Sequence, residues 1–224
     1  MDKIFSEIEL RRYAKQIRSP LIGLQGQEKL KKSRVLVIGA GSMGTPVLQY
    51  LAAAGIGVLG ICDFKTIQES DYPSQIMYGL GDLGKLKTIV AKEKIQLLNP
   101  FVILQIHNIQ LREENVNIIC EGYDLLMDCT NEANVLPFLL QKTNIPTLVG
   151  RIGVDKGEIA YFPSEPNRKL AAAIYLPTDE TCLLGSLCGT LGCLLAYHAV
   201  QTILADFQVP ASQIRIDVPL LYVK

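Results

Sequence analysis

Short apolar runs alternate with amphipathic stretches along most of this chain. The apolar runs predict buried strands at residues 35–38, 58–63, 101–106, 124–129 and 147–151. Apolar residues at helical spacing between them predict helices at residues 44–54, 85–98, 113–120 and 134–142. Because strands alternate with helices, we expect an α/β fold with a mostly parallel sheet.

Both ends of the chain depart from this alternation. A capping box of Ser6 and Glu9 predicts the start of a helix that runs to residue 17, and a second helix is expected over residues 25–32. The turn signal Asp155-Lys156-Gly157 predicts a hairpin with a strand on either side. Later segments are expected as a loop at 163–185, an apolar helix at 188–206 and a strand at 214–221.

These elements predict one domain with a doubly wound, Rossmann-like sheet. The 224 residues are enough for a single sizeable α/β domain. Within it we expect a helical N-terminal extension at residues 1–33, a Rossmann-like core at 34–151, and an antiparallel tail with a late helix at 152–224. Residues 65–84 show no clean period and are interpreted as a loop with short helical turns.

The most informative segment follows the first predicted strand. Gly39, Gly41 and Gly44 form a G-x-G-x-x-G loop that opens a helix, and Asp63 ends the next apolar run. This spacing predicts a tight turn, a close backbone approach to phosphate, and close packing of helix on strand. The helix N-terminus favours an anion, and the acid is placed to accept hydrogen bonds from ribose hydroxyls. The pattern predicts a nucleotide site that includes Gly39, Gly41, Ser42, Gly44 and Asp63.

Composition narrows the classes of partner. Lys plus Arg and Asp plus Glu each number 22, so the formal net charge is zero and nucleic-acid or membrane-surface binding has no electrostatic support. We expect no membrane span, since no apolar run approaches the ~20 residues required. The N-terminus lacks the pattern of a signal peptide. The six cysteines form no C-x-x-C pair, and most lie in apolar runs, which favours a reducing cytoplasm.

Further motifs surround the glycine loop. The segment at 12–17 reads Arg-Tyr-Ala-Lys-Gln-Ile, and the segment at 26–30 reads Gly-Gln-Glu-Lys-Leu. This resembles the R-Y-x-R-Q-I…G-Q-x-x-L opening of the ThiF/MoeB/HesA family, the bacterial relatives of ubiquitin-activating enzymes. The resemblance covers nearly the whole chain and continues at Asp63-Phe64-x-Thr66, Gly84-x-x-Lys87, Asn99-Pro100, Asp128-Cys129-Thr130, Gly157-x-Ile159 and Thr181-Cys182.

The resemblance implies an adenylylation reaction. A small ubiquitin-like carrier protein that ends in Gly-Gly would present its C-terminal carboxylate to the α-phosphate of Mg-ATP, and acyl-AMP would form as pyrophosphate leaves. The protein would act by positioning and by neutralising phosphate charge. The resemblance further implies a cytoplasmic homodimer in which Lys15 reaches the partner's pocket. The associated pathways are sulfur-carrier chemistry in thiamine, molybdopterin or cysteine biosynthesis.

Several residues match the positions of the family's site, and four of them differ in kind. The segment of this chain that matches the family's S-N-L-x-R-Q loop has Asp71 in place of the Asn and Ser74 in place of the Arg. The metal carboxylate of D-C-x-D-N is Asn131, and the arginine of R-Q-I is Lys15. The resemblance assigns catalytic roles to Lys87, Asp128 and Asn131, and nucleotide contacts also to Lys15, Asp71, Ser74, Gln75 and Lys87. The three substitutions at 71, 74 and 131 leave the site one charge more negative, which disfavours a triphosphate.

Structural roles compete with functional ones at three positions. Lys87 is either a phosphate ligand or a solvent-facing lysine of a lysine-rich helix, and Asp128 is either a site residue or the cap of the following turn. Cys182 is favoured as an ordinary loop thiol over a reactive one. The two C-x-x-C pairs that often hold zinc in this family are absent. We therefore expect no zinc and assign no metal ligands.

Three functions remain open. The first is ATP-dependent adenylylation of a carrier C-terminus. The second is a degenerate family member that binds a nucleotide or a carrier without adenylylation, which the substitutions at Ser74 and Asn131 favour. The third is an NAD-dependent oxidoreductase, against which the N-terminal R-Y-x-x-Q-I segment argues.

Overall fold

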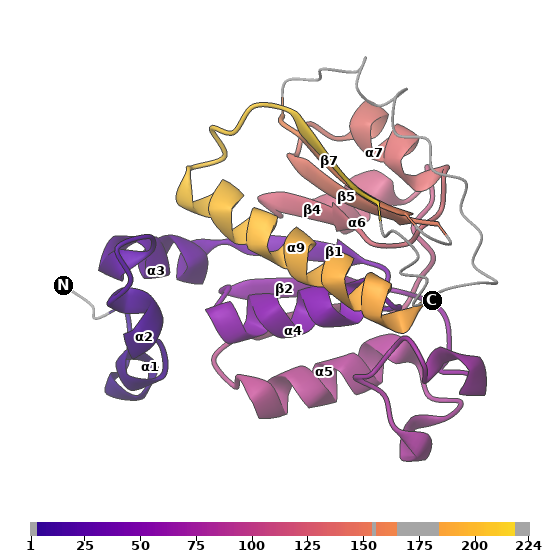
Figure 1. Ribbon diagram of the computed structural model, residues 1–224, viewed down its shortest axis with the longest axis horizontal. Helices are drawn as coiled ribbons and strands as arrows, with labels where there is room; N and C mark the ends of the chain where they lie inside the picture. Colours follow the sequence, from indigo (N-terminus) through magenta and orange to yellow (C-terminus); the bar gives the residue numbers. More distant parts are fainter. Residues whose placement is uncertain (1–3, 154–155, 165–183, 218–224) are drawn as a thin grey trace, which may run out of the picture.

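A seven-stranded sheet forms the centre of the computed structural model, which describes residues 4–153, 156–164 and 184–217 (Figure 1). The strand order is β3-β2-β1-β4-β5-β6-β7. The first five strands pair in parallel, and the last two pair antiparallel. The strands are β1 (Arg34–Ile38), β2 (Val58–Cys62), β3 (Ile103–His107), β4 (Leu125–Asp128), β5 (Thr147–Ile152), β6 (Lys156–Phe162) and β7 (Ser212–Asp217). The predicted doubly wound, mostly parallel sheet with antiparallel C-terminal strands is confirmed.

Helices cover both faces of this sheet (Figure 1). One face packs against α4 (Gly44–Ala54), α5 (Lys87–Leu98) and α9 (Gly185–Leu204). The other packs against α6 (Val116–Cys120) and α7 (Val135–Lys142). The central strands are apolar on both faces because both are covered, and for this reason β1 reads as a continuous apolar run.

The N-terminal extension differs from its prediction in one place. The capping box of Ser6 and Glu9 is present, but the expected single helix is divided at Tyr13 into α1 (Glu7–Arg12) and α2 (Ala14–Ile17). The Tyr13 ring is buried, and its hydroxyl accepts a hydrogen bond from Asn99 Nδ2 at 2.8 Å. The break seats this ring against the end of α4. The next helix, α3 (Gly23–Lys32), begins two residues before its predicted start.

Other boundaries shift by a few residues. Helix α5 begins at Lys87 rather than at residue 85, because Leu86 is extended and bridges to Thr66. Helix α6 begins at residue 116 rather than 113, and β3 covers 103–107 rather than 101–106. Two 3-10 helices, at Glu69–Asp71 and Leu80–Asp82, confirm the short turns expected in the loop after β2. The hairpin residue Asp155, most of the loop at 163–185, and the end of the last predicted strand lie outside the described residues.

Helix α9 corrects the expectation that no apolar run reaches the length of a membrane span. Its residues Gly185–Leu204 are long and apolar enough by length and composition, with a mean hydropathy of 1.4 over an 18-residue stretch. Half of that stretch is buried inside the protein, and α9 packs against α4, where a Cβ on Gly192 would meet Pro46. Packing in the protein core thus accounts for the apolar residues on the buried half of α9.

Candidate nucleotide site

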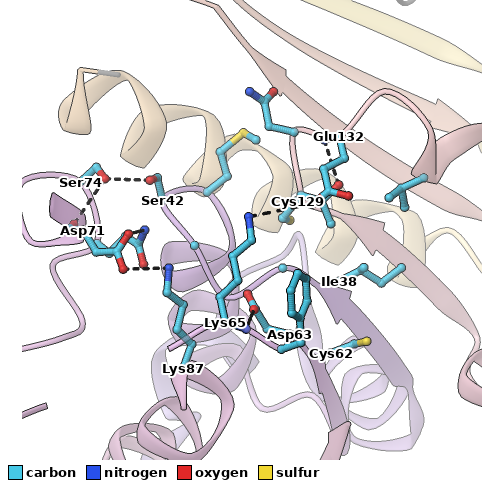
Figure 2. Close-up of a pocket in the computed structure, with 18 of the residues that line it drawn as sticks. Ile38, Ser42, Cys62, Asp63, Lys65, Asp71, Ser74, Lys87, Cys129 and Glu132 are labelled. Carbon is cyan, nitrogen blue, oxygen red and sulfur yellow. Dashed lines mark hydrogen bonds and ion pairs between the residues drawn. The ribbon is translucent and has the colours of Figure 1, made fainter. Parts of the chain in front are cut away.

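A cavity of about 570 Å³ opens at the carboxyl ends of β1 and β4. The strand order reverses between these two strands, which is where open α/β sheets bind ligands. The glycine loop, the loop after β2, the start of α5 and the loop after β4 all contribute to its walls (Figure 2). Nine of the predicted site residues line it: Gly39, Gly41, Ser42, Asp63, Asp71, Ser74, Gln75, Lys87 and Asn131.

A different structural feature explains the glycine at each of the three positions in the loop. Gly39 has φ 94°, and a Cβ there would lie 3.0 Å from the carbonyl of Cys129. A Cβ on Gly44 would lie 1.8 Å from Gly39 O, so α4 can begin this close to β1 only with glycine. At Gly41 a Cβ would approach protein no nearer than 3.9 Å, at Gln75 Nε2. Gly41 therefore faces the cavity and leaves its backbone open to a ligand.

Asp63 is fixed at the end of β2 by backbone donors. Its Oδ2 accepts a hydrogen bond from Ala40 N, and its Oδ1 accepts one from Lys65 N, each at 2.8 Å. The first of these bonds ties the carboxylate to the glycine loop itself. Each oxygen keeps a further lone-pair direction, so the carboxylate can also accept from the hydroxyls of a sugar.

The far wall of the cavity is a hydrogen-bonded group of side chains. Lys87 Nζ lies 3.0 Å from Asp71 Oδ2, and Gln75 Nε2 donates to Asp71 Oδ1 at 2.7 Å. The Ser42 and Ser74 hydroxyls lie 2.8 Å apart and join the glycine loop to this wall. Lys87 is only 5% exposed, so the alternative of a solvent-facing lysine is wrong. Figure 2 shows the Asp71–Lys87 pair beside the glycine loop.

Asn131 lies in the cavity wall, but its amide is already bonded. Its Nδ2 donates to Ile152 O at 3.1 Å, and its Oδ1 accepts from Ile152 N at 2.9 Å. The residue has φ 61°, a left-handed conformation that asparagine tolerates well. Within the described residues, no group of three or more His, Cys, Asp or Glu side chains could hold a metal. One lone pair of Asn131 Oδ1 is thus already used by Ile152 N, and the expected absence of zinc stays a prediction.

Asp128 lies beneath the cavity rather than in its wall. It is fully buried, its Oδ2 lies 2.6 Å from Arg151 Nη2, and its Oδ1 accepts from both Thr130 N and Thr130 Oγ1. The structure thus shows the turn-capping role that competed with a site role. Arg151 also donates to Glu132 O, so the pair braces the loop that carries Asn131.

Lys15 is remote from the cavity of its own chain. Helix α2 packs at the C-terminal end of α4, where Gln16 approaches Ala53, while the glycine loop lies at the N-terminal end. The 11 residues of α4 separate these ends by about 16 Å. Figure 1 shows α1, α2 and α3 gathered at one end of the molecule. A contact between Lys15 and a nucleotide therefore requires a second chain.

Lys65 and Glu132 also line the cavity, and neither was among the predicted site residues. Lys65 Nζ lies 4.0 Å from Glu132 Oε1, and the lysine side chain is 47% exposed. Their positions just after Asp63 and Asn131, in two loops at the same sheet edge, could have indicated them. With them the cavity wall carries three carboxylates and two ammonium groups.

Two cysteines also reach the cavity, and neither is set up to react. Burial, with Asp63 nearby, raises the pKa of the Cys62 thiol to about 12. Burial raises the pKa of Cys129 as well, with Asp128 adding to the effect. Both thiols stay protonated at neutral pH, whereas a nucleophilic cysteine needs its thiolate. Cys182 lies outside the described residues.

The fold and the cavity together define a class of protein: a doubly wound α/β protein with a glycine-loop pocket of the nucleotide-binding type. A sequence model of the ThiF family matches residues 13–219. The chain belongs to the ThiF family, as its motifs implied.

Curated relatives agree with this placement. The molybdopterin-synthase adenylyltransferase of Haemophilus influenzae is 32% identical over 211 residues, which cover 90% of this chain and 86% of the relative. The sulfur carrier protein adenylyltransferase of Thermus thermophilus is 38% identical over 160 residues, covering 69% of this chain and 58% of the relative. A probable adenylyltransferase/sulfurtransferase MoeZ of Mycobacterium tuberculosis is 40% identical over 126 residues, which span only 32% of its length.

Solved structures share the fold at lower identity. PaaA superimposes with a TM-score of 0.77 at 19% identity, over 98% of this chain and 73% of that chain. The Escherichia coli tRNA N6-threonylcarbamoyladenosine dehydratase TcdA gives a TM-score of 0.72 at 18% identity, over 92% of this chain and 99% of that chain. At these identities the likeness shows the fold alone.

Proposed function

We propose that this chain binds ATP and adenylylates the C-terminal carboxylate of a small ubiquitin-like sulfur-carrier protein ending in Gly-Gly. The observation that carries the proposal is the open backbone at Gly41 and the anchored Asp63, which face one cavity in a ThiF-family chain. Two relatives that are 32% and 38% identical are named as adenylyltransferases of this chemistry. The proposal places the chain in the cytoplasm, without nucleic-acid or membrane partners.

The proposed reaction needs little covalent chemistry from the protein. A carboxylate oxygen of the carrier attacks the α-phosphorus of ATP, the bond from that phosphorus to the bridging oxygen breaks, and pyrophosphate leaves with the electron pair. The glycine loop would hold the phosphates at the N-terminus of α4, and Asp63 would hold the ribose. Lys87 would neutralise phosphate charge, although its ammonium group is already paired with Asp71.

The chain is proposed to act as a homodimer. Lys15 lies too far from its own cavity to touch a nucleotide there, and a two-fold dimer is the commonest oligomer. In such a dimer Lys15 would approach the pocket of the partner. Because lysine lacks the bidentate fork of arginine, its contribution would be a single charge.

A second candidate function is nucleotide or carrier binding without adenylylation. Two observations favour it: Asn131 is bonded to Ile152 instead of presenting a carboxylate to a metal, and Lys87 is paired with Asp71. ThiF-family membership and the names of the relatives argue against the NAD-dependent oxidoreductase.

Exchange of radiolabelled pyrophosphate into ATP separates the two candidates. Exchange that depends on a carrier ending in Gly-Gly supports the adenylyltransferase, and a carrier with its last glycine removed is the control. Adenosine nucleotide binding without exchange supports the binding protein. In that case the double variant Ser74→Arg and Asn131→Asp restores the family's charged ligands. Recovery of exchange in this variant would show that the chain lost catalysis through these two substitutions.

A further inference from the structure

The lysine expected at the phosphates is paired with Asp71, and two further groups bond that carboxylate. Asp71 Oδ2 lies 3.0 Å from Lys87 Nζ and accepts from Gln68 N at 2.8 Å, while Gln75 Nε2 donates to Asp71 Oδ1. We call Asp71, Gln75 and Lys87 the Asp71 clamp. The Lys87 side chain is 6% exposed and that of Asp71 is 16% exposed, so water screens their attraction poorly.

The rest of the cavity offers little positive charge to replace Lys87. Lys65 is the other ammonium group among the described lining residues, and it faces Glu132 at 4.0 Å. A phosphate that enters the cavity therefore meets the Asp71 carboxylate beside the lysine that should receive it. Two anions that contact one buried ammonium group repel each other, so each is bound less strongly than it would be alone.

We propose that Asp71 is an internal competitor for phosphate at Lys87 and thereby sets which nucleotides the pocket accepts. The clamp is closed when the phosphate subsite is free, and each added phosphate must displace or repel the carboxylate. The pocket then favours nucleotides with few phosphates over a triphosphate. This inference rests on the proposed function, because it takes the cavity to be a nucleotide site.

The Asp71→Asn variant removes the competing charge with little change of shape. The new amide oxygen can still accept from Gln68 N. Gln75 Oε1 is buried without a hydrogen-bond partner among the described residues, and it can accept from the new amide group once its own amide rotates. The variant is therefore expected to fold, and circular dichroism and thermal melting check this. Asp71→Ser is a second variant that also removes the charge.

Calorimetric titration with adenosine, AMP and ATP tests the proposal. In Asp71→Asn the ATP affinity is expected to rise about tenfold or more, the scale of one charge-assisted hydrogen bond. Adenosine affinity is expected to change by less than about twofold, since it carries no charge. AMP should fall between them. The gain should vanish when Lys87→Ala is added, because no ammonium group is then released.

Glu132→Gln is the matched control. It removes one negative charge from the same cavity but leaves the clamp closed. An equal gain in ATP affinity in both variants would show that the net charge of the cavity, and not the Asp71–Lys87 pair, sets the affinity. That result would overturn the proposal. So would an unchanged or lower ATP affinity in a folded Asp71→Asn protein that still binds adenosine, since the ion pair would then be merely structural. If neither the wild type nor the variants bind any of the three ligands, the proposed function itself fails.

Discussion

The amide of Asn131 joins the cavity wall to strand β5, so its replacement by aspartate makes a sharp test. Asn131 is 6% exposed, and its side chain bonds Ile152 through both its oxygen and its nitrogen. In Asn131→Asp the bond from Ile152 N is kept. The bond to Ile152 O is lost, and a carboxylate oxygen is placed against that carbonyl.

The expected cost follows from these two contacts. A buried acceptor left without its donor costs about 1–3 kcal/mol, and the repulsion of two oxygens adds to this. We expect a loss of about 2–4 kcal/mol in the free energy of unfolding. For a chain of this size, that lowers the melting temperature by roughly 4–16 °C. Backbone strain should not contribute, because aspartate tolerates the left-handed conformation of residue 131 nearly as well as asparagine.

The loss should depend on pH in a defined direction. Burial and the nearby carbonyl raise the pKa of the new carboxyl group in the folded state, so the folded protein holds a proton that the unfolded chain releases. Stability therefore falls as pH rises through the window between the two values. The ordinary pKa of an aspartate carboxyl group is about 3.9. Near pH 4 the protonated carboxyl group of the folded variant can donate to Ile152 O, so the loss of stability should be largely absent.

Urea denaturation of Asn131→Asp and wild type, at about pH 4 and about pH 8, measures this difference. Glu132→Gln, one residue away, is the control and should match the wild type more closely. An unchanged midpoint at high pH would refute the reasoning, because the amide of Asn131 would then be free of Ile152 and available to a ligand. Recovery of the high-pH deficit by magnesium would show that the new carboxylate binds a cation.

Three further predictions concern packing, burial and assembly. Gly44→Ala should destabilise by more than about 3 kcal/mol or prevent folding, since its Cβ would lie 1.8 Å from Gly39 O; soluble yield and melting temperature measure this. Burial raises the pKa of Glu158, so stability should fall as pH rises above 4.5, and Glu158→Gln should flatten that slope in denaturation curves. Light scattering should show a dimer, and Lys15→Ala should weaken ATP binding without changing the dimer mass; a monomer at tens of micromolar would contradict the assembly.

Local sequence patterns determined most of the fold. The strand, glycine loop and helix around Gly39 lie where the spacing predicted, and α4 begins and ends at its predicted residues. The periods and spacings that predict these elements are local and can be read from the sequence, although the close contact that requires glycine at position 39 is with Cys129, far along the chain. The break at Tyr13 was not readable in this way, because the contacts of the buried Tyr13 side chain, including its hydrogen bond with Asn99, are with residues far along the chain.

Only the tertiary structure decided what the site residues bond to. The sequence by itself determined the ThiF-like order of motifs, the glycine loop and Asp63, all of which rest on short-range spacing. It left open whether Lys87 faces water or ligand, and the structure pairs that lysine with Asp71. Partners such as Asn131 and Ile152 meet because β4 and β5 are neighbours in the sheet. Strand order brings together residues that no local pattern relates, and it thereby sets the charge and the free hydrogen-bonding groups of the pocket.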